Sequence, residues 1–217
     1  MQPDPRDARL AAVRPLLLAI LSYALFLTIG LFVSHKPLVP LDEAGLWIVG
    51  HASLTAWILT WTLYMLWLAP LGLALIIVAI LRPRWRTRIA VSLILLLIMW
   101  FAADQLQHIF ARPRRLDWVL KHETSFSYPS SHATLAVAFY GFWAYLFSRS
   151  SELSPPLRTW IPAMLVVLIG AVCWARLALG AHYPTDILGG VLLGLAGVNL
   201  ALAVCAAFGE TFGPAPA

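Results

Sequence analysis

The stretch WIPAMLVVLIGAVCWARLALGAHYPTDILGGVLLGLAGVNLALAVCAA, residues 160–207, decides how this chain folds. It holds two apolar runs of about 20 residues, the length that an α-helix needs to cross the ~30 Å hydrocarbon core of a bilayer. The break between them contains His182 and Asp186, and Arg176 lies just before it. The pattern predicts two membrane-spanning helices, Trp160–Leu179 and Pro184–Ala207, joined by a short polar turn.

The rest of the chain has the same apolar character. Of its 217 residues, 61% are hydrophobic and 12% are charged, whereas the charged fraction of a soluble domain is typically ~25%. The net charge of +5 does not indicate nucleic-acid binding, because most arginines lie at the ends of apolar runs, where membrane orientation accounts for them. Cys173 and Cys205 both lie inside apolar runs, which argues against a disulfide framework or a cysteine-rich metal site.

Hydropathy predicts an all-α, polytopic membrane protein with six transmembrane helices in a single domain, residues 1–217. The four remaining spans are Val13–Val33, Leu54–Leu81 with an expected kink at Pro70, Ile89–Phe110, and Ser131–Phe147. The first could be a cleaved signal peptide, but its apolar stretch exceeds the ~7–15 residues of such a segment, so a retained helix is favoured. Between the first two spans, Pro40–Glu43 and Trp47 form either an interfacial segment or an ordinary loop.

Arginines set the expected orientation. The segments before the first span, between the second and third, and between the fourth and fifth are rich in them: Arg6, Arg9, Arg14, Arg82, Arg84, Arg86, Arg88, Arg149 and Arg158. The positive-inside rule places these segments, and with them both termini, in the cytoplasm. The opposite face also carries cations, which we interpret as retained for chemistry: Arg112, Arg114, Arg115 and Lys121.

With six spans, four helix ends that carry polar motifs emerge on the extracytoplasmic face. They are the end of the third helix at Gln105–Pro113, the start of the fourth at Ser130–His132, the end of the fifth at Arg176, and the start of the sixth at His182–Asp186. Motifs far apart in sequence are therefore expected to converge on one pocket at the membrane surface. Polar groups there can reach water, and a lipid can enter sideways.

The spacing of His182 and Asp186 puts both side chains on one side of the first helical turn. The carboxylate can accept a proton from one ring nitrogen and leave the other nitrogen free to attack phosphorus. Alternatively, Asp186 only caps the helix and His182 is an interfacial histidine. Arg176 lies at the end of an apolar helix, where a charge is costly unless it has a partner, which favours a binding role over snorkelling to headgroups.

The segment Pro129–His132 opens the fourth helix, so its backbone N–H groups and a serine hydroxyl can form an anion seat. The structural alternative is an N-cap from Ser130 or Ser131. His132 can protonate a leaving oxygen. The planar guanidinium of Arg112 can donate two hydrogen bonds to phosphate oxygens, or it can bind anionic headgroups. Fixed cations, backbone donors and two imidazoles together are what phosphoryl transfer needs.

The other histidines and the spacing of possible metal ligands do not indicate a further site. Four histidines have no carboxylate at a convincing spacing and are interpreted as loop or interface residues: His35, His51, His108 and His122. No spacing typical of a metal site is present.

The order and spacing of the motifs resemble the type-2 phosphatidic-acid phosphatase superfamily, with its K-x6-R-P, P-S-G-H and S-R-x5-H-x3-D patterns and, in its membrane branch, a six-helix core. Here they read QLQHIFARP, PSSH and ARLALGAHYPTD, between Gln105 and Asp186. The resemblance implies that His182 is the nucleophile that forms a phosphohistidine, that Asp186 orients it and that His132 is the general acid. It implies no metal or other cofactor, and it implies phosphate binding by Arg112, Ser130, Ser131 and Arg176, with Gln105 at the position of the family lysine.

Three positions depart from the family motifs: Gln105 replaces the lysine, Ser131 the glycine and Ala175 the serine. The change at Ser131 is mild, because the backbone N–H remains. Gln105 can donate a hydrogen bond to phosphate but brings no charge. Arg114, Arg115 or Lys121 could compensate for that missing charge.

We therefore expect a membrane lipid phosphatase in a bacterial-type inner membrane. Candidate substrates are undecaprenyl pyrophosphate, phosphatidic acid and phosphatidylglycerol phosphate. The alternatives are a phosphotransferase that passes the phosphate to another lipid or sugar, and a non-catalytic membrane protein that binds anionic lipid. A transporter fits less well, because the charged residues cluster at one face.

Overall fold

The computed structural model describes residues 5–36, 38–43, 45–49, 54–61, 65–114 and 125–209. Within these ranges the chain is all-helical and contains no strand. Among the helices of the described residues, four are long and apolar enough to cross a membrane: Leu10–Val33, Pro83–Phe110, Pro155–Ala178 and Pro184–Ala207. Their outer faces carry exposed large apolar side chains such as Leu31, Ile98 and Val167, as expected where a helix faces lipid rather than water.

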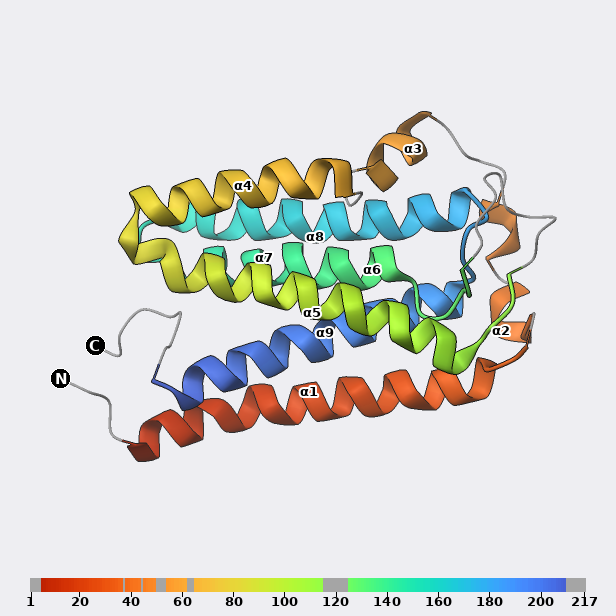
Figure 1. Ribbon diagram of the computed structural model, residues 1–217, viewed down its shortest axis with the longest axis horizontal. Helices are drawn as coiled ribbons and strands as arrows, with labels where there is room; N and C mark the ends of the chain where they lie inside the picture. Colours follow the sequence, from red (N-terminus) through yellow and green to blue (C-terminus); the bar gives the residue numbers. More distant parts are fainter. Residues whose placement is uncertain are drawn as a thin grey trace.

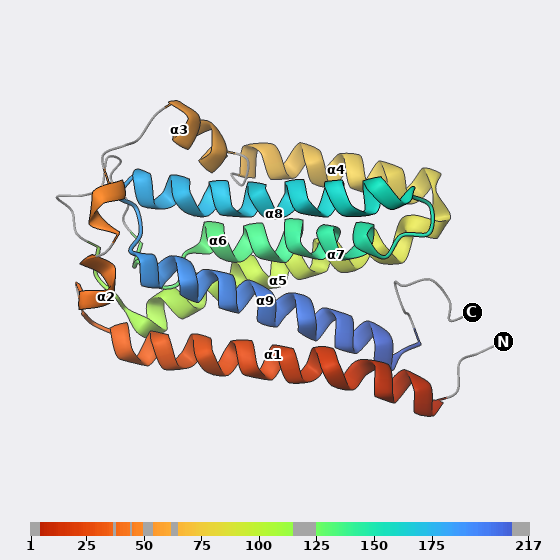
Figure 2. The same ribbon diagram turned by 180° about the vertical axis from the view of Figure 1, so that it is seen from behind.

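The long helices run side by side along the long axis of the molecule (Figures 1 and 2). They are α1 (Pro5–Val33), α4 (Met65–Leu81), α5 (Arg86–Phe110), α8 (Pro155–Ala178) and α9 (Pro184–Ala207). A further continuous segment consists of α6 (Ser131–Ala136), the π-helix η3 (Val137–Gly141) and α7 (Phe142–Ser148). The short elements are α2 (Pro40–Glu43), η1 (Leu46–Ile48), α3 (Leu54–Trp61) and η2 (Pro83–Trp85).

Two of the six predicted spans, 54–81 and 131–147, are not among the four membrane-length helices of the described residues. The span expected at 54–81 consists of two helices, α3 and α4, with residues 62–64 between them outside the described residues. Pro70 lies inside α4. At ~1.5 Å per residue, α4 is about 26 Å long and the α6–α7 segment about 27 Å, each somewhat short of the ~30 Å hydrocarbon core. Six crossings therefore remain a prediction.

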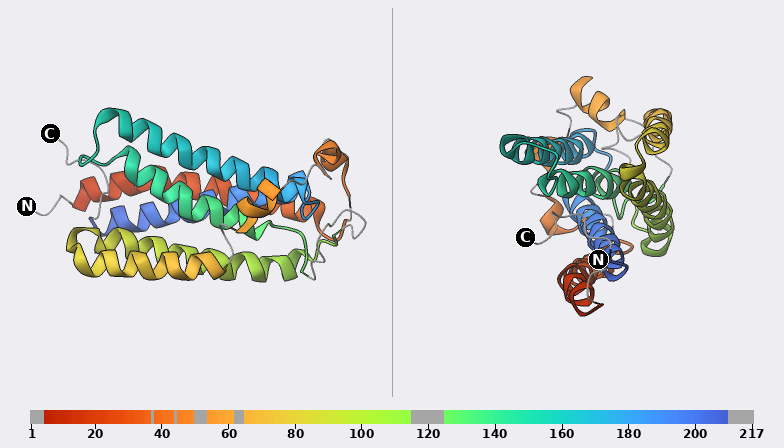
Figure 3. Two further views of the ribbon diagram at one scale, coloured as in Figure 1. Left: turned by 90° about the horizontal axis from the view of Figure 1, so that it is seen from above. Right: turned by 90° about the vertical axis from the view of Figure 1, so that its left-hand side faces the viewer.

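The helix ends that carry the motifs lie together. The end of α5, the start of α6, the end of α8 and the start of α9 all lie at one end of the bundle, next to α2 (Figure 1). The orange segment directly after α1, which contains α2, lies at this same end in the left view of Figure 3, seen from above. The first turns of α1 and the last turns of α9 lie at the opposite end (Figure 2).

α9 holds this arrangement together, because glycines let neighbouring backbones approach it closely. A Cβ atom at Gly190 would lie 2.5 Å from the carbonyl oxygen of Ser130, and one at Gly194 would lie 2.7 Å from the Cβ of Val137. No side chain can be accommodated at such distances, so both positions require glycine, as is common where membrane helices pack tightly. The start of α6 is therefore in direct contact with the second turn of α9.

Tyr128 anchors the segment before α6 between α1 and α9. Its ring stacks on Phe26 with centroids 5.5 Å apart, and its hydroxyl donates a 2.6 Å hydrogen bond to the Phe26 carbonyl. Cβ atoms at Gly30 and Gly189 would lie 2.8 and 2.3 Å from the Tyr128 ring. This fit fixes the position of the neighbouring residue, Ser127.

Candidate active site

Arg112 occupies the centre of the polar cluster. α5 ends at Ala111, which adopts a left-handed conformation with φ of 44°, and the chain then turns so that the Arg112 side chain is fully buried. Nη1 donates to Oδ1 of Asp186 at 2.6 Å, and Nη2 donates to Oδ2 of Asp42 at 2.5 Å. The guanidinium thus lies between two buried carboxylates, one from α2 and one from α9.

Thr185 and a main-chain carbonyl complete the surroundings of Arg112. The Thr185 hydroxyl accepts a 2.7 Å hydrogen bond from Nη1, and the carbonyl of Lys36 accepts one of 3.1 Å from Nε. Arg112 therefore lies at the site, as the sequence predicts, but these hydrogen bonds go to protein acceptors. Its role as a phosphate ligand stays a prediction.

Asp42 belongs to this site although its segment, Pro40–Glu43, was expected to be either interfacial or an ordinary loop. The residue is fully buried in α2. Its Oδ1 accepts hydrogen bonds from the backbone N–H of Thr185 at 3.0 Å and from the Thr185 hydroxyl at 2.7 Å. One signal was available in the sequence: a carboxylate beside an apolar run must find a buried partner or remain in water.

His182 lies in the turn between α8 and α9, almost completely buried. Its Nδ1 is 2.9 Å from the carbonyl oxygen of Ser127. A carbonyl can only accept, so Nδ1 carries the proton and the neutral ring keeps the lone pair on Nε2. This is the tautomer that a nucleophilic imidazole requires.

The surroundings of His182 favour its neutral form. Burial lowers its pKa well below the ordinary value, and the nearby cations Arg114 and Arg176 lower the pKa further, because a positive charge disfavours an imidazolium. The hydrogen bond to Ser127 acts in the opposite direction but is outweighed. Near neutral pH the ring is therefore unprotonated on Nε2.

Asp186 makes different contacts from the expected one. The predicted hydrogen bond to His182 is not formed, since Oδ2 lies 3.6 Å from Nδ1 and the Ser127 carbonyl is the closer acceptor. Oδ2 instead accepts from the backbone N–H of Tyr183 at 2.9 Å, as part of a capping box at the start of α9. The capping alternative noted from the sequence is therefore observed, together with the ion pair to Arg112.

Ser130 and Ser131 also have structural partners. Ser130 is the N-cap of α6, with its hydroxyl oxygen accepting from the N–H of Ala133, and its own N–H donates to the Asp186 carbonyl at 3.1 Å. The backbone donor of Ser130 is thus used to join α6 to α9. The hydroxyl of Ser131 accepts a 3.0 Å hydrogen bond from Gln107, a contact that the sequence did not reveal.

Gln107, rather than Gln105, reaches the PSSH segment. Gln107 is buried, and its Nε2 donates to the Pro129 carbonyl at 2.9 Å as well as to Ser131. Gln105, at the position of the family lysine, is exposed, and its amide donates to the side chain of Asp104 at 3.1 Å. The structure therefore gives Gln107 a place in the site that was expected for Gln105.

Arg114 and Arg176 supply positive charge close to His182. Arg114 donates to the carbonyl of Ala181, the residue before His182, and its Nε donates to the Ser125 carbonyl at 2.8 Å. Arg176, in the last turn of α8, is almost completely buried. Of the three cations considered as replacements for the family lysine, Arg114 thus lies at the site, while Arg115 and Lys121 fall outside the described residues.

The remaining histidines fall into three groups. His132 is half-buried in the first turn of α6, two residues after Ser130. His35 and His108 are exposed, and the His108 ring packs edge-on against Phe126. His51 and His122 lie outside the described residues. Within the described part of the chain, no three His, Cys, Asp or Glu side chains are grouped so as to hold a metal ion.

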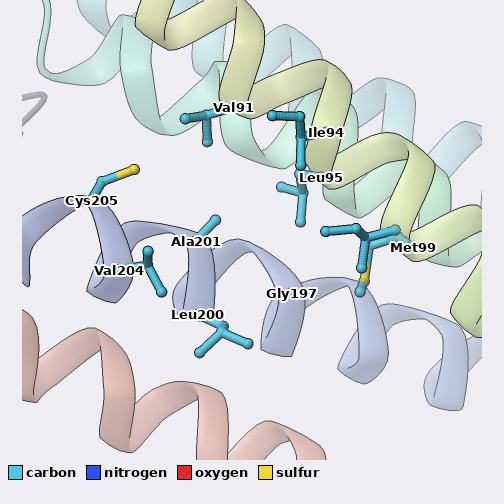
Figure 4. A pocket seen from close by; sticks show the side chains of 10 residues that line it. Val91, Ile94, Leu95, Met99, Gly197, Leu200, Ala201, Val204 and Cys205 are labelled. Atoms are coloured by element: carbon cyan, nitrogen blue, oxygen red, sulfur yellow. The ribbon is translucent and has the colours of Figure 1, made fainter.

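A separate apolar cavity of about 260 Å³ lies between α5 and α9 (Figure 4). Its lining includes Val91, Leu95, Met99, Leu200 and Val204, and it contains no charged side chain. On α9, Leu200 and Val204 lie about 24 and 30 Å from the first residue, Pro184, at ~1.5 Å per residue, far from His182. The cavity suits hydrocarbon and cannot hold the phosphate chemistry.

Sequence comparison identifies relatives of the motif region. Residues 106–209 match the PAP2 superfamily. A putative undecaprenyl-diphosphatase, YbjG, of Escherichia coli is 34% identical over 91 residues, which cover 42% of this chain and 41% of that protein. Phosphatidylglycerophosphatase B of Bacillus subtilis is 30% identical over 110 residues, which cover 46% of this chain and 52% of that protein. The chain thus spans about half or less of these relatives.

The fold also matches a solved structure. It superimposes on the crystal structure of a transmembrane PAP2 type phosphatidylglycerolphosphate phosphatase from Bacillus subtilis with a TM-score of 0.73 and 23% sequence identity. The match covers 84% of this chain and 93% of that one. The resemblance expected from the three motifs is confirmed: residues 106–209 of this membrane protein match the PAP2 superfamily.

Proposed function

We propose that this chain is a lipid phosphatase that removes a terminal phosphate through a covalent phosphohistidine on His182. The observation that carries the proposal is the state of that imidazole. Its Nδ1–H is held by the Ser127 carbonyl, its Nε2 is unprotonated, and Arg114 and Arg176 provide positive charge beside it. A neutral nucleophile next to fixed cations is suited to attack an anionic phosphoryl group.

In the first step, Nε2 of His182 attacks phosphorus in line with the bond to the lipid oxygen. The N–P bond forms, the P–O bond to the lipid breaks, and His132 protonates the departing oxygen. The Nδ1–H of the phosphorylated ring remains bonded to the Ser127 carbonyl. In the second step, water attacks phosphorus, His132 takes its proton, and inorganic phosphate and neutral His182 are released.

Arg114 and Arg176 are proposed to bind the phosphate oxygens. In this assignment Arg114 replaces the charge of the family lysine, because Gln105 is exposed and hydrogen-bonded to Asp104. Arginine is well suited to the task, since its planar fork matches two phosphate oxygens. Ser131 and the first N–H groups of α6 lie beside the site and complete the anion seat.

We further propose that the site opens on the outer face of a bacterial-type inner membrane, with six crossings and both termini in the cytoplasm. The arginine-rich turns at the opposite end of the bundle, including η2, support this orientation. The two named relatives point to undecaprenyl diphosphate and phosphatidylglycerol phosphate as substrate candidates, and phosphatidic acid is the third.

The proposal is tested by measuring phosphate release from these three lipids by purified protein in detergent. We expect wild-type protein to release inorganic phosphate from at least one of them and His182→Ala to release none. His108→Ala is the matched control, because it removes an exposed histidine from the same end of the bundle and should retain full activity. Release of lipid product without free phosphate would indicate transfer to another acceptor, and wild-type protein inactive on all three lipids would refute the proposal.

A further inference from the structure

We infer that Asp42 is a positioning residue for the proposed reaction: through Thr185 and Arg112 it holds the first turn of α9, and with it His182, in register with the rest of the site. The inference rests on the proposed function. It concerns a segment outside all three sequence motifs, since Asp42 is 70 residues from Arg112 and 143 from Thr185.

The first argument is that Asp42 caps α9 from another element. Thr185 is the second residue of α9, and its N–H has no partner within the helix. Oδ1 of Asp42 accepts from that N–H at 3.0 Å and from the Thr185 hydroxyl at 2.7 Å. A carboxylate at this position also interacts favourably with the helix dipole. Asp42 thus fixes both the start and the direction of α9.

The second argument is that Asp42 keeps Arg112 directed at α9. Its Oδ2 accepts from Nη2, while Nη1 of the same guanidinium binds Asp186. Without Asp42, the guanidinium would keep fewer anionic partners and would be drawn toward an incoming phosphate. The Asp186 carboxylate that this guanidinium binds also accepts from the backbone N–H of Tyr183, which joins α9 to the turn that carries His182.

The third argument is the shape of the segment around Asp42. A Cβ atom at Gly45 would lie 2.3 Å from Cγ of Pro184, so this part of the chain packs directly on the first residue of α9. The segment that contains α2 and Gly45 therefore packs against the start of α9. The first residue of α9, Pro184, comes two residues after His182. This contact with Pro184 explains why residue 45, three residues after Asp42, is a glycine.

The neighbouring acid provides a matched control. Glu43 is in the same short helix and has the same charge, but its side chain is exposed, whereas Asp42 is fully buried. Asp42→Asn and Glu43→Gln therefore change the charge equally, one residue apart. Only the first change affects the cluster around Arg112.

The measurement is single-turnover formation of the phosphoenzyme by rapid quench, with whichever of the three candidate lipids wild-type protein hydrolyses fastest. The amplitude reports the fraction of correctly folded protein, while the first-order rate constant does not depend on that fraction. We expect Asp42→Asn to lower the rate constant about 10- to 100-fold, as loss of a hydrogen bond to a charged group would. Glu43→Gln should leave rate constant and amplitude unchanged.

A second variant covers the case in which Asp42→Asn does not fold. Thr185→Val removes the hydroxyl that links Asp42 to Arg112 but leaves both charges, and we expect a rate constant about 3- to 10-fold lower at normal amplitude. A loss of amplitude alone, or a wild-type rate constant in the variant that folds, would overturn the inference while leaving the proposed function intact. Wild-type protein without any phosphatase activity would instead overturn the proposed function, and the inference with it.

Discussion

The cluster of Arg112 with two buried carboxylates leads to a prediction about stability that can be worked out from its contacts. Arg112→Gln would leave Asp42 and Asp186, both fully buried, without their shared cation. Removing one member of a buried ion pair costs roughly 3–5 kcal/mol of unfolding free energy, mostly because the remaining charge is uncompensated. Each carboxylate retains other donors, from Thr185 and Tyr183 respectively, so we expect about 3 kcal/mol.

A second substitution tests the cause of that loss. In an Arg112→Gln background, Asp42→Asn removes one of the two uncompensated charges. It should therefore lower the free energy of unfolding much less than Asp42→Asn does in the wild-type protein. The double variant is expected to be about 1–3 kcal/mol more stable than the sum of the two single effects predicts, a coupling typical of contacting residues.

The assay is unfolding of detergent-solubilised protein by sodium dodecyl sulfate, followed by circular dichroism. Arg149→Gln, which removes an exposed arginine at the end of α7, is the control and should change stability by less than about 0.5 kcal/mol. Additive effects of Arg112→Gln and Asp42→Asn, or a loss below about 1 kcal/mol in Arg112→Gln, would refute the ion-pair account.

Three further substitutions test other parts of the site. Arg114→Gln should lower kcat/KM and move its acidic limb to higher pH, because removing this cation raises the pKa of the nucleophilic imidazole, which must be neutral to react. Gln107→Leu should lower kcat/KM about 10-fold, since both hydrogen bonds from its amide to the PSSH segment are lost. Gly190→Ala should destabilise the protein by roughly 1–3 kcal/mol and reduce activity, because the new methyl group would meet the main chain of α6.

Two of these predictions have a control within the chain. Gln105→Leu, on the exposed face of α5, should change kcat/KM less than Gln107→Leu, and the reverse order would restore Gln105 as the functional amide. Gly170→Ala, where a Cβ would meet nothing within 4 Å, should leave stability unchanged. An acidic limb that stays in place or moves to lower pH in Arg114→Gln would contradict the proposed electrostatics.

Much of the arrangement at the candidate site follows from local sequence and from the alternating direction of successive helices. The convergence of the four motif-bearing helix ends depends only on which end of each helix carries polar residues, and they do lie together (Figure 1). The cap formed by Asp186 likewise follows from its place three residues after Tyr183, at the start of an apolar run. Local rules of this kind make His182, Asp186 and Arg112 identifiable as members of one site.

The contacts that the sequence did not reveal depend on tertiary packing. Gln105 and Gln107 are about 200° apart around α5, at 3.6 residues per turn, so only the packed orientation of the helix decides which one faces the site. The acceptor for His182 is the main-chain carbonyl of Ser127, a group that every residue carries. Asp42 is brought to Arg112 by the path of the chain between α1 and α3, which no local pattern encodes.

The number of crossings also could not be read from hydropathy alone. The described residues of the predicted span at 54–81 belong to two helices, α3 and α4 (Figure 1). The segment from 131 to 148 is helical as predicted but contains the π-helix η3. An apolar stretch can form one continuous helix or two shorter ones. Hydropathy reports burial in lipid or protein and does not report whether a helix is continuous.

The measurement that tests the central claim most directly is the location of the transferred phosphate. Wild-type protein mixed briefly with its lipid substrate, quenched in alkali and digested, should yield a peptide phosphorylated at Nε2 of His182 whose label is lost in acid. The same peptide from His182→Ala should carry none. Continued turnover without a trapped phosphoenzyme, or phosphate found on another side chain, would contradict the account.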